Sequence, residues 1–218
     1  DELKQFDVVM ANPPYSIKRW SQAKFMNDPF GRNIWGTPPQ GCADYGFQQH
    51  IIKSLKPDTG RSVSLWPHGV LFRDSEASMR KKMIEEDVVD AVIGLGKNLF
   101  YNSSMESCLL VCSMNKPKER KGKVIFIDGK DEIRLERSAA YLKDEHIKRM
   151  ADAYWNFKDE EGFTKVMSSK EILEENDGNL SIQLYVKTNG EESTHTVEQL
   201  LAKAKTNQDS LQTGFDEL

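Results

Sequence analysis

The chain has 218 residues, of which 38% are hydrophobic and 29% are charged, and its formal net charge is −4. This composition is typical of a globular protein that is long enough to bury a core. The excess of acidic residues argues against a free-standing nucleic-acid binder, because neutralising phosphates needs a surplus of cations. The three cysteines are widely spaced, which fits a reducing compartment. No apolar stretch reaches the roughly 20 residues that span a bilayer, so we expect a cytoplasmic protein without a membrane partner.

The first 130 residues alternate predicted strands and helices. Short apolar runs predict strands at 6–11, 62–66, 88–95, 107–113 and 123–128. Apolar residues at helical spacing predict a helix that begins at Asp44 and another over 78–86, whereas residues 16–43 have no periodicity and predict a long loop. This order predicts an α/β sheet with helices on both faces. The last two strands before residue 114 are expected to be antiparallel, because only a loop joins them.

The sequence changes character near residue 130. Three helices are indicated beyond it, by Ile147, Met150, Ala151, Tyr154 and Trp155, by the capping box Ser168-x-x-Glu171, and by Thr196-x-x-Gln199 with the apolar stripe Val197, Leu200, Leu201 and Ala204. We therefore expect a sheet-containing part, residues 1–130, and a mostly helical extension, residues 131–218. The basic run 116–123 is interpreted as a solvated connector.

The residues that point most directly to chemistry are Asn12, Pro13, Pro14 and Tyr15, which follow the first predicted strand. Ligands of open α/β sheets bind at the carboxyl ends of strands, and the two prolines hold the backbone rigid there. A nucleobase amine could donate its two N–H groups to the Asn12 side-chain oxygen and the Pro13 carbonyl. Its lone pair would then be localised for attack on an electrophilic methyl group, while Tyr15 stacks on a base turned out of its duplex. The alternative is that the prolines simply end the strand.

Other reactive side chains form no recognisable constellation. Cys108 and Cys112 point to the same face of a predicted strand, but no second pair of cysteines or histidines stands at zinc spacing. We interpret both as buried thiols and predict no metal. The four histidines are scattered, with no serine or carboxylate arranged around them.

Longer stretches around the proline motif resemble a known family. The segment FDVVMANPPY at 6–15 and the segments 45–73, 88–116, 121–129 and 162–186 resemble the modification (HsdM-like) subunit of type I restriction–modification systems. The resemblance covers about residues 6–187. It implies a Rossmann-like methyltransferase sheet that uses S-adenosylmethionine to methylate N6 of adenine in DNA. Asn12, Pro13 and Tyr15 would then hold the flipped adenine, and Pro14 would make the turn rigid.

The resemblance also points to a second aromatic residue. Phe100 lies in the predicted loop 96–101 and matches the position at which related adenine methyltransferases place an aromatic ring against the flipped base. Phe100 could equally be a core residue, and Tyr101 is a competing candidate for the same role.

In this family the glycine-rich cofactor loop and the acidic residue that holds the cofactor ribose lie upstream of the motif. Only eleven residues precede Asn12 here, so we expect this chain to be the C-terminal part of the catalytic domain and to be inactive alone. Asn12 is then the candidate cofactor contact within the chain. The implied partners are DNA, the specificity subunit and the restriction subunit, and the DNA sequence recognised belongs to another chain.

Two other functions remain open. The same motif resembles that of glutamine methyltransferases that act on protein release factors, although those chains usually end soon after the sheet. Residues 131–218 could instead be a non-catalytic module that docks on a specificity subunit through the stripe at 197–204.

Overall fold

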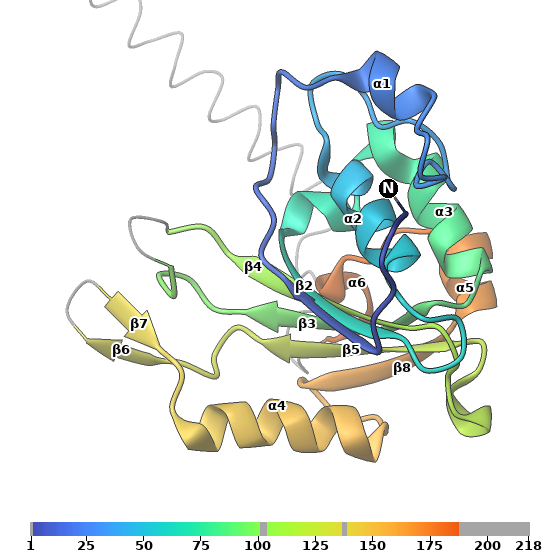
Figure 1. The fold of residues 1–218 in the computed structure, drawn as a ribbon. Coiled ribbons are helices and arrows are strands. Elements are labelled where there is room, and N and C mark those ends of the chain that lie inside the picture. The colour runs from blue at the N-terminus through green and yellow to red at the C-terminus, as the bar shows by residue number, and fades with distance from the viewer. Residues whose placement is uncertain (1, 101–103, 137–138, 188–218) are drawn as a thin grey trace, which may run out of the picture. The chain divides into compact units, whose positions relative to one another are not determined.

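A six-stranded mixed sheet, in the order β1-β2-β4-β3-β5-β8, runs through the part of the chain that is described, residues 2–100, 104–136 and 139–187 of a computed structural model (Figure 1). The strands are β1 (Val8–Ala11), β2 (Arg61–Pro67), β3 (Val89–Leu95), β4 (Ser107–Ser113), β5 (Lys123–Gly129) and β8 (Thr164–Ser168), with β6 (Arg134–Glu136) and β7 (Ala139–Tyr141) paired separately. The helices are α1 (Gln22–Met26), α2 (Asp44–Lys53), α3 (Ala77–Glu85), α4 (Asp144–Asn156), α5 (Ser169–Glu174) and α6 (Ile182–Tyr185), with 3-10 turns η1 (His68–Leu71), η2 (Asp74–Glu76) and η3 (Lys118–Arg120).

Four of these strands point in the same direction. β1 is parallel to β2 and β3 is parallel to β5, while β4 lies antiparallel between β2 and β3. The carboxyl ends of β1, β2, β3 and β5 therefore meet at one edge of the sheet, where ligands of α/β proteins bind. The predicted antiparallel pairing of the β3 and β4 segments is confirmed.

Helices cover both faces of the sheet, as the sequence predicts. Along β5, Val124 and Phe126 belong to a core cluster that includes residues of α2, α3, α5 and α6. The alternate residues Ile125 and Ile127 belong to a second cluster with Met150 of α4, which covers the opposite face (Figure 1). Side chains of a strand alternate between its faces, and a strand buried on both faces reads as one continuous apolar run. Burial of each such side chain contributes about 1.5–3 kcal/mol.

The sheet does not end at residue 130. β8 pairs antiparallel with β5, from Lys123 opposite Ser168 to Ile127 opposite Thr164, and residues Asp1–Lys187 form one compact unit. The segment 131–187 is thus not mostly helical, because it contributes β6, β7 and β8 as well as three helices. A five-residue edge strand that carries a lysine and is only half-buried gives too weak a periodic signal to be found from sequence. The third expected helix, with its stripe at 197–204, lies outside the described residues.

The basic run 116–123 is not a solvated connector throughout. The Lys116 side chain is buried, and its Nζ lies 2.6 Å from an Asp87 carboxylate oxygen and donates to the Lys123 carbonyl at 2.7 Å. Arg120 is also buried, 3.3 Å from Asp90, and its guanidinium lies 4.5 Å from the centre of the Phe157 ring. Composition alone cannot tell such buried cations from solvated ones, because their acidic partners come from distant parts of the chain.

The capping box at Ser168 is present as predicted, with the Ser168 hydroxyl accepting from the Glu171 amide at 3.1 Å.

Segment 16–43 contains one short helix, α1, and no strand, in agreement with the predicted loop. Across the described residues, no helix has both the length and the apolar character needed to cross a lipid bilayer.

Candidate functional site

The Asn12–Tyr15 motif leaves the sheet at the carboxyl end of β1, which pairs with β2 and is the edge strand among the described residues. The Asn12 side chain is exposed and has no hydrogen-bond partner in the described part of the chain. Tyr15 is half-buried and packs against the core cluster that includes α2. The motif thus presents a polar amide to solvent and keeps its aromatic ring at the surface of the core.

The residue after this motif holds an unfavourable backbone conformation. Ser16 has φ of 55°, in the left-handed region, which costs a residue with a side chain roughly 1–2 kcal/mol. The Ser16 amide donates to the Asp44 carboxylate at 2.6 Å. Asp44 is buried and begins α2, where a negative charge is also favoured by the helix dipole. One carboxylate therefore stabilises the turn that directs Tyr15.

Asp44 is held in turn by a partly buried arginine, Arg73. Nη1 of Arg73 lies 2.7 Å from Asp44 Oδ2 and 3.0 Å from Glu76 Oε2, and it donates to the Cys42 sulfur at 2.9 Å. A Cβ atom at Gly69 would come within 2.5 Å of the Arg73 guanidinium, so the absence of a side chain there leaves room for this arrangement. The corner after β1 is thus connected to the segment after β2.

Titration of the groups around Arg73 is strongly affected by burial. Burial raises the pKa of Cys42 to about 12, so its thiol is neutral and donates to a Glu76 oxygen at 3.4 Å. Burial also raises the pKa of Glu76, although the neighbouring Arg73 charge opposes this. Among the described residues, Cys42, Asp44 and Glu76 are close enough together to ligate an ion, but the Arg73 guanidinium already supplies the positive charge between them.

Helix α2 is fastened to β2 by a buried polar network. The Gln48 side-chain oxygen accepts from the Ser64 hydroxyl at 3.0 Å and from the Trp66 indole at 3.1 Å. Trp66 is itself buried, and its indole N–H is shared between Gln48 and the Ser64 hydroxyl, which lies at 2.8 Å. The helix that carries Asp44 therefore has a defined position over the strand next to β1.

Phe100, the predicted second aromatic contact to the base, does not lie in the cluster that contains Tyr15. It is half-buried after β3 and packs against the cluster on the α4 side of the sheet, where it lines an apolar cavity of about 520 Å³. Tyr15 packs on the opposite side. β1 and β3 are separated by three strand spacings of ~4.8 Å, about 14 Å in all. The structure therefore brings Asn12–Tyr15 together with Asp44 but does not bring Phe100 into the same cluster, and Tyr101 lies outside the described residues.

Sequence reasoning found the motif and missed the groups that support it. Asp44 and Arg73 are 29 residues apart, and Arg73 meets Asp44 only because β1 and β2 lie side by side. The available signals were an acidic residue at the start of a helix and a glycine four residues before an arginine. Neither signal specifies a partner.

The described residues do not form a complete pocket for S-adenosylmethionine. Residues 1–11 contain no glycine, so they do not include the glycine-rich turn that cradles a nucleotide-like cofactor. Cys108 and Cys112 are buried thiols, as predicted, and do not contribute to this edge of the sheet.

Residues 1–194 match the family described as N-6 DNA Methylase. The chain belongs to this family. It is 33% identical over 192 residues to a type I restriction enzyme MjaVII methylase subunit from Methanocaldococcus jannaschii, covering 84% of this chain and 33% of that protein. It is 32% identical over 201 residues to the HindI methylase subunit from Haemophilus influenzae, covering 85% and 42%. The N-6 DNA methylase assignment confirms the predicted resemblance.

The structural comparison agrees with the N-6 DNA methylase assignment. The crystal structure of the type I restriction–modification methyltransferase subunit from Streptococcus thermophilus matches with a TM-score of 0.77 and 36% identity, covering 84% of this chain and 39% of that one. The EcoKI M protein matches with a TM-score of 0.60 at 20% identity, which shows the fold alone. This chain spans about a third to two fifths of the length of its curated relatives.

Replacing Asp44 by alanine should destabilise the corner after β1. The change removes the acceptor for the Ser16 amide and one of the two carboxylates paired with Arg73. Breaking a buried ion pair costs about 3–5 kcal/mol, so we expect a fall in melting temperature of about 6–20 °C by calorimetry. Asp74→Ala, an exposed carboxylate in the adjacent turn, is the control and should change little. Equal melting temperatures for both variants would contradict this role of Asp44.

Glu76 should make stability depend on pH in a defined direction. Its pKa is raised from about 4.5 because burial disfavours the charged form. The fold therefore favours protonated Glu76, and this stabilisation is present below about pH 4.5 and lost as pH rises through the raised pKa. Glu76→Gln stays uncharged, so its melting temperature relative to wild type should rise between pH 4 and 8. Thermal melts across this range measure the difference, and a constant or falling difference would disprove the assignment.

Proposed function

We propose that this chain supplies the adenine-binding side of a DNA N6-adenine methyltransferase. The observation that carries the proposal is the exposed Asn12 amide on a diproline corner at the carboxyl end of β1, with the Tyr15 ring beside it. The corner is made rigid by Pro13 and Pro14 and by the Asp44 contact to Ser16. Membership of the N-6 DNA methylase family supports adenine over a glutamine side chain as the methyl acceptor.

The chain's own residues would act on the accepting amine. The adenine N6 amine is a weak nucleophile because its lone pair is delocalised into the ring. The Asn12 Oδ1 atom and the Pro13 carbonyl oxygen would each accept one of its N–H groups, which favours a tetrahedral nitrogen with a localised lone pair. Tyr15 would stack on the extruded base and hold it in line for attack. The nitrogen would form a bond to the methyl carbon as the bond between that carbon and its leaving group breaks, and the nitrogen would then release one N–H proton to solvent.

The cofactor of the whole enzyme is S-adenosylmethionine, as the family implies, and it would supply the electrophilic methyl group. Asn12 is the residue of this chain proposed to contact it. The chain spans about a third to two fifths of the length of its curated relatives, which supports the proposal that these 218 residues alone do not catalyse methyl transfer. Phe100 is proposed as a second base contact, which would require the loop after β3 to move from its packing against the α4 side of the sheet.

The proposed partners follow from the relatives, which are named as methylase subunits of type I restriction enzymes. In such an assembly the chain would meet DNA, a specificity subunit that reads the sequence, and a restriction subunit. The division into a catalytic part and a docking part is proposed to fall later than residue 130, because β8 belongs to the catalytic sheet.

The proposal predicts that Asn12 is required for methyl transfer. The 218-residue chain would replace the matching segment of the Streptococcus thermophilus subunit, and the chimera would be assayed with that system's specificity subunit, labelled S-adenosylmethionine and adenine-containing DNA. Removing a pre-positioned acceptor costs about a hundred- to a thousandfold in kcat, so Asn12→Ala should lose activity by that factor. Asn156→Ala, an exposed amide at the end of α4, is the matched control and should keep full activity.

Two substitutions of Tyr15 distinguish the loss of base stacking from the loss of structure in the same assay. Tyr15→Phe keeps the ring and should retain most activity, whereas Tyr15→Ala should weaken DNA binding and raise KM by roughly fivefold or more, because base stacking contributes about 1–3 kcal/mol. The isolated 218-residue chain should transfer no methyl group. An active Asn12→Ala chimera would overturn the proposed function.

A further inference from the structure

A pocket lined by aromatic residues opens next to the segment that follows the Asn12–Tyr15 motif. It has a volume of about 300 Å³ and lies between the segment 17–32 and helix α2. Its walls include Ile17, Trp20 and Phe25 on one side and Gly46, Phe47 and His50 on the other. This volume is at the lower end of the range for small-molecule sites, which is about 300–1,000 Å³. It is large enough for one flat ring system.

The walls of this pocket are held in place by hydrogen bonds. The Trp20 indole donates to the Pro39 carbonyl at 3.3 Å, and its ring meets Phe25 edge to face at 5.8 Å. Gln22 donates to the Pro38 carbonyl at 2.8 Å. The aromatic rings are therefore oriented before any ligand arrives, which reduces the entropy that binding would cost.

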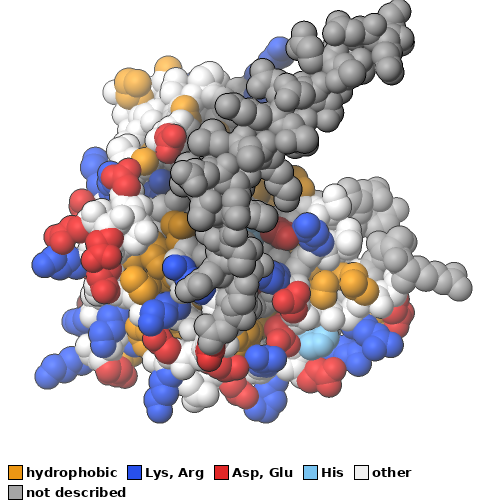
Figure 2. Space-filling model, turned by 180° about the vertical axis from the view of Figure 1, so that it is seen from behind, with side chains coloured by type: hydrophobic (Ala, Val, Ile, Leu, Met, Phe, Trp, Pro, Cys, Tyr) orange, Lys and Arg blue, Asp and Glu red, His pale blue; other side chains and the backbone are white. Residues whose placement is uncertain are grey.

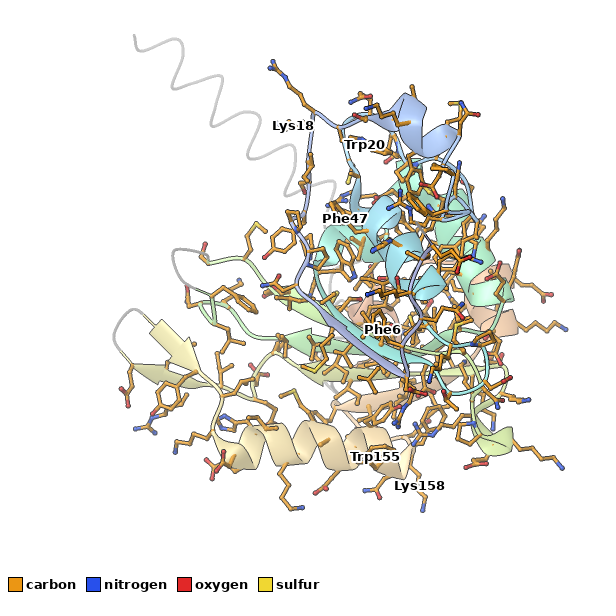
Figure 3. The ribbon with its side chains drawn as sticks, viewed as in Figure 1. Phe6, Lys18, Trp20, Phe47, Trp155 and Lys158 are labelled. Atoms are coloured by element: carbon orange, nitrogen blue, oxygen red, sulfur yellow. The ribbon has the colours of Figure 1, made fainter. Side chains whose placement is uncertain are left out.

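Exposed cations lie on the segment that forms the outer wall of the pocket, and Arg32, which also lines the pocket, is paired with Asp28. Residues 8–27 include Lys18, Arg19 and Lys24, all exposed, and no acidic residue, although the whole chain has a net charge of −4. Figure 3 shows Lys18 extending away from the body near Trp20, with Phe47 deeper. The face seen in Figure 2 instead has acidic and basic side chains interspersed. Burial lowers the pKa of His50, and the nearby Arg32 lowers it further, so its ring is uncharged at neutral pH.

The pocket is also close to the proposed adenine site along the chain. Ile17 is two residues beyond Tyr15, a distance of at most about 7 Å in extended backbone. Neighbouring bases of an unstacked strand are separated by a similar distance. Aromatic rings that stack on bases, combined with cations that follow the phosphates, are the usual means of holding single-stranded nucleic acid.

We infer that this pocket binds a second nucleobase of the DNA strand that carries the target adenine. The inference rests on the proposed function, because it takes the strand to pass the Asn12–Tyr15 corner. Trp20 and Phe47 would stack on the base, and Lys18 and Arg19 would neutralise the adjacent phosphates. The proposed interaction is binding alone, with no covalent step.

The test is a binding measurement on the complete 218-residue chain. The probe is a fluorescein-labelled oligothymidylate of about twelve nucleotides, measured by anisotropy at low salt, and its comparison strand has the same backbone with abasic sugars. Trp20→Ala should weaken binding of the base-carrying strand about five- to a hundredfold and leave the abasic strand unchanged. Trp155→Ala removes an exposed tryptophan of α4 and should change neither.

A second variant tests the pocket from its other wall without disturbing the Trp20 segment. A Cβ atom at Gly46 would meet its neighbours at 3.7 Å or more, so the helix accommodates the first atom of a side chain, and Gly46→Leu is designed to occupy the pocket that Gly46 lines. It should weaken base-dependent binding as Trp20→Ala does. Equal losses for abasic and base-carrying strands, no loss in either variant, or no binding by the wild-type chain would each overturn the inference. A chimera that methylates DNA despite these results would leave the proposed function standing and reject only the second base site.

Discussion

The corner after β1 depends on a single buried carboxylate. Asp44 accepts from the Ser16 amide at 2.6 Å and lies 2.7 Å from Nη1 of Arg73. The first contact offsets the strain of a left-handed serine, and the second prevents a buried negative charge from being unpaired. Because Asp44 begins α2, any shift of this helix would move the backbone that follows Tyr15. The geometry of the proposed adenine site is therefore determined by packing under the motif as much as by the motif itself.

Sheet topology explains why this arrangement can exist. β1 and β2 run parallel, so the residues that follow them meet at the same edge although some fifty residues separate the strands. Asn12–Tyr15 follow β1, and Gly69 and Arg73 follow β2. The antiparallel β4 lies between β2 and β3, so the loop that contains Phe100 begins two strand positions away from the end of β2 along the same edge. One face of the sheet supports the corner through α2, while the other face is packed with α4.

Partly or fully buried cations paired with carboxylates recur in the described residues. Arg73 lies among Asp44, Glu76 and Cys42, and Arg120 lies against Asp90 while donating to the Tyr154 carbonyl at 2.9 Å. Burying a charge without a partner costs several kcal/mol, so these pairs specify one arrangement of their segments even where their net contribution to stability is small. The cations at 18, 19 and 24 are different, because they are exposed on the segment that follows the Asn12–Tyr15 motif.

The sequence alone was sufficient to predict strands β1 to β5, the α2 and α3 helices, the antiparallel β3–β4 pair and the Asn12–Tyr15 motif. Apolar periodicity and proline chemistry are local properties, so they can be read along the chain. The sequence also carried the resemblance to the methylase family. It could not place β8 in the sheet, because a half-buried edge strand lacks a strong pattern. Nor could it show that Lys116 is buried, that Asp44 supports Ser16, or that Phe100 and Tyr15 pack on opposite faces. Those facts depend on contacts between residues far apart in the chain, and only the tertiary structure brings such residues together.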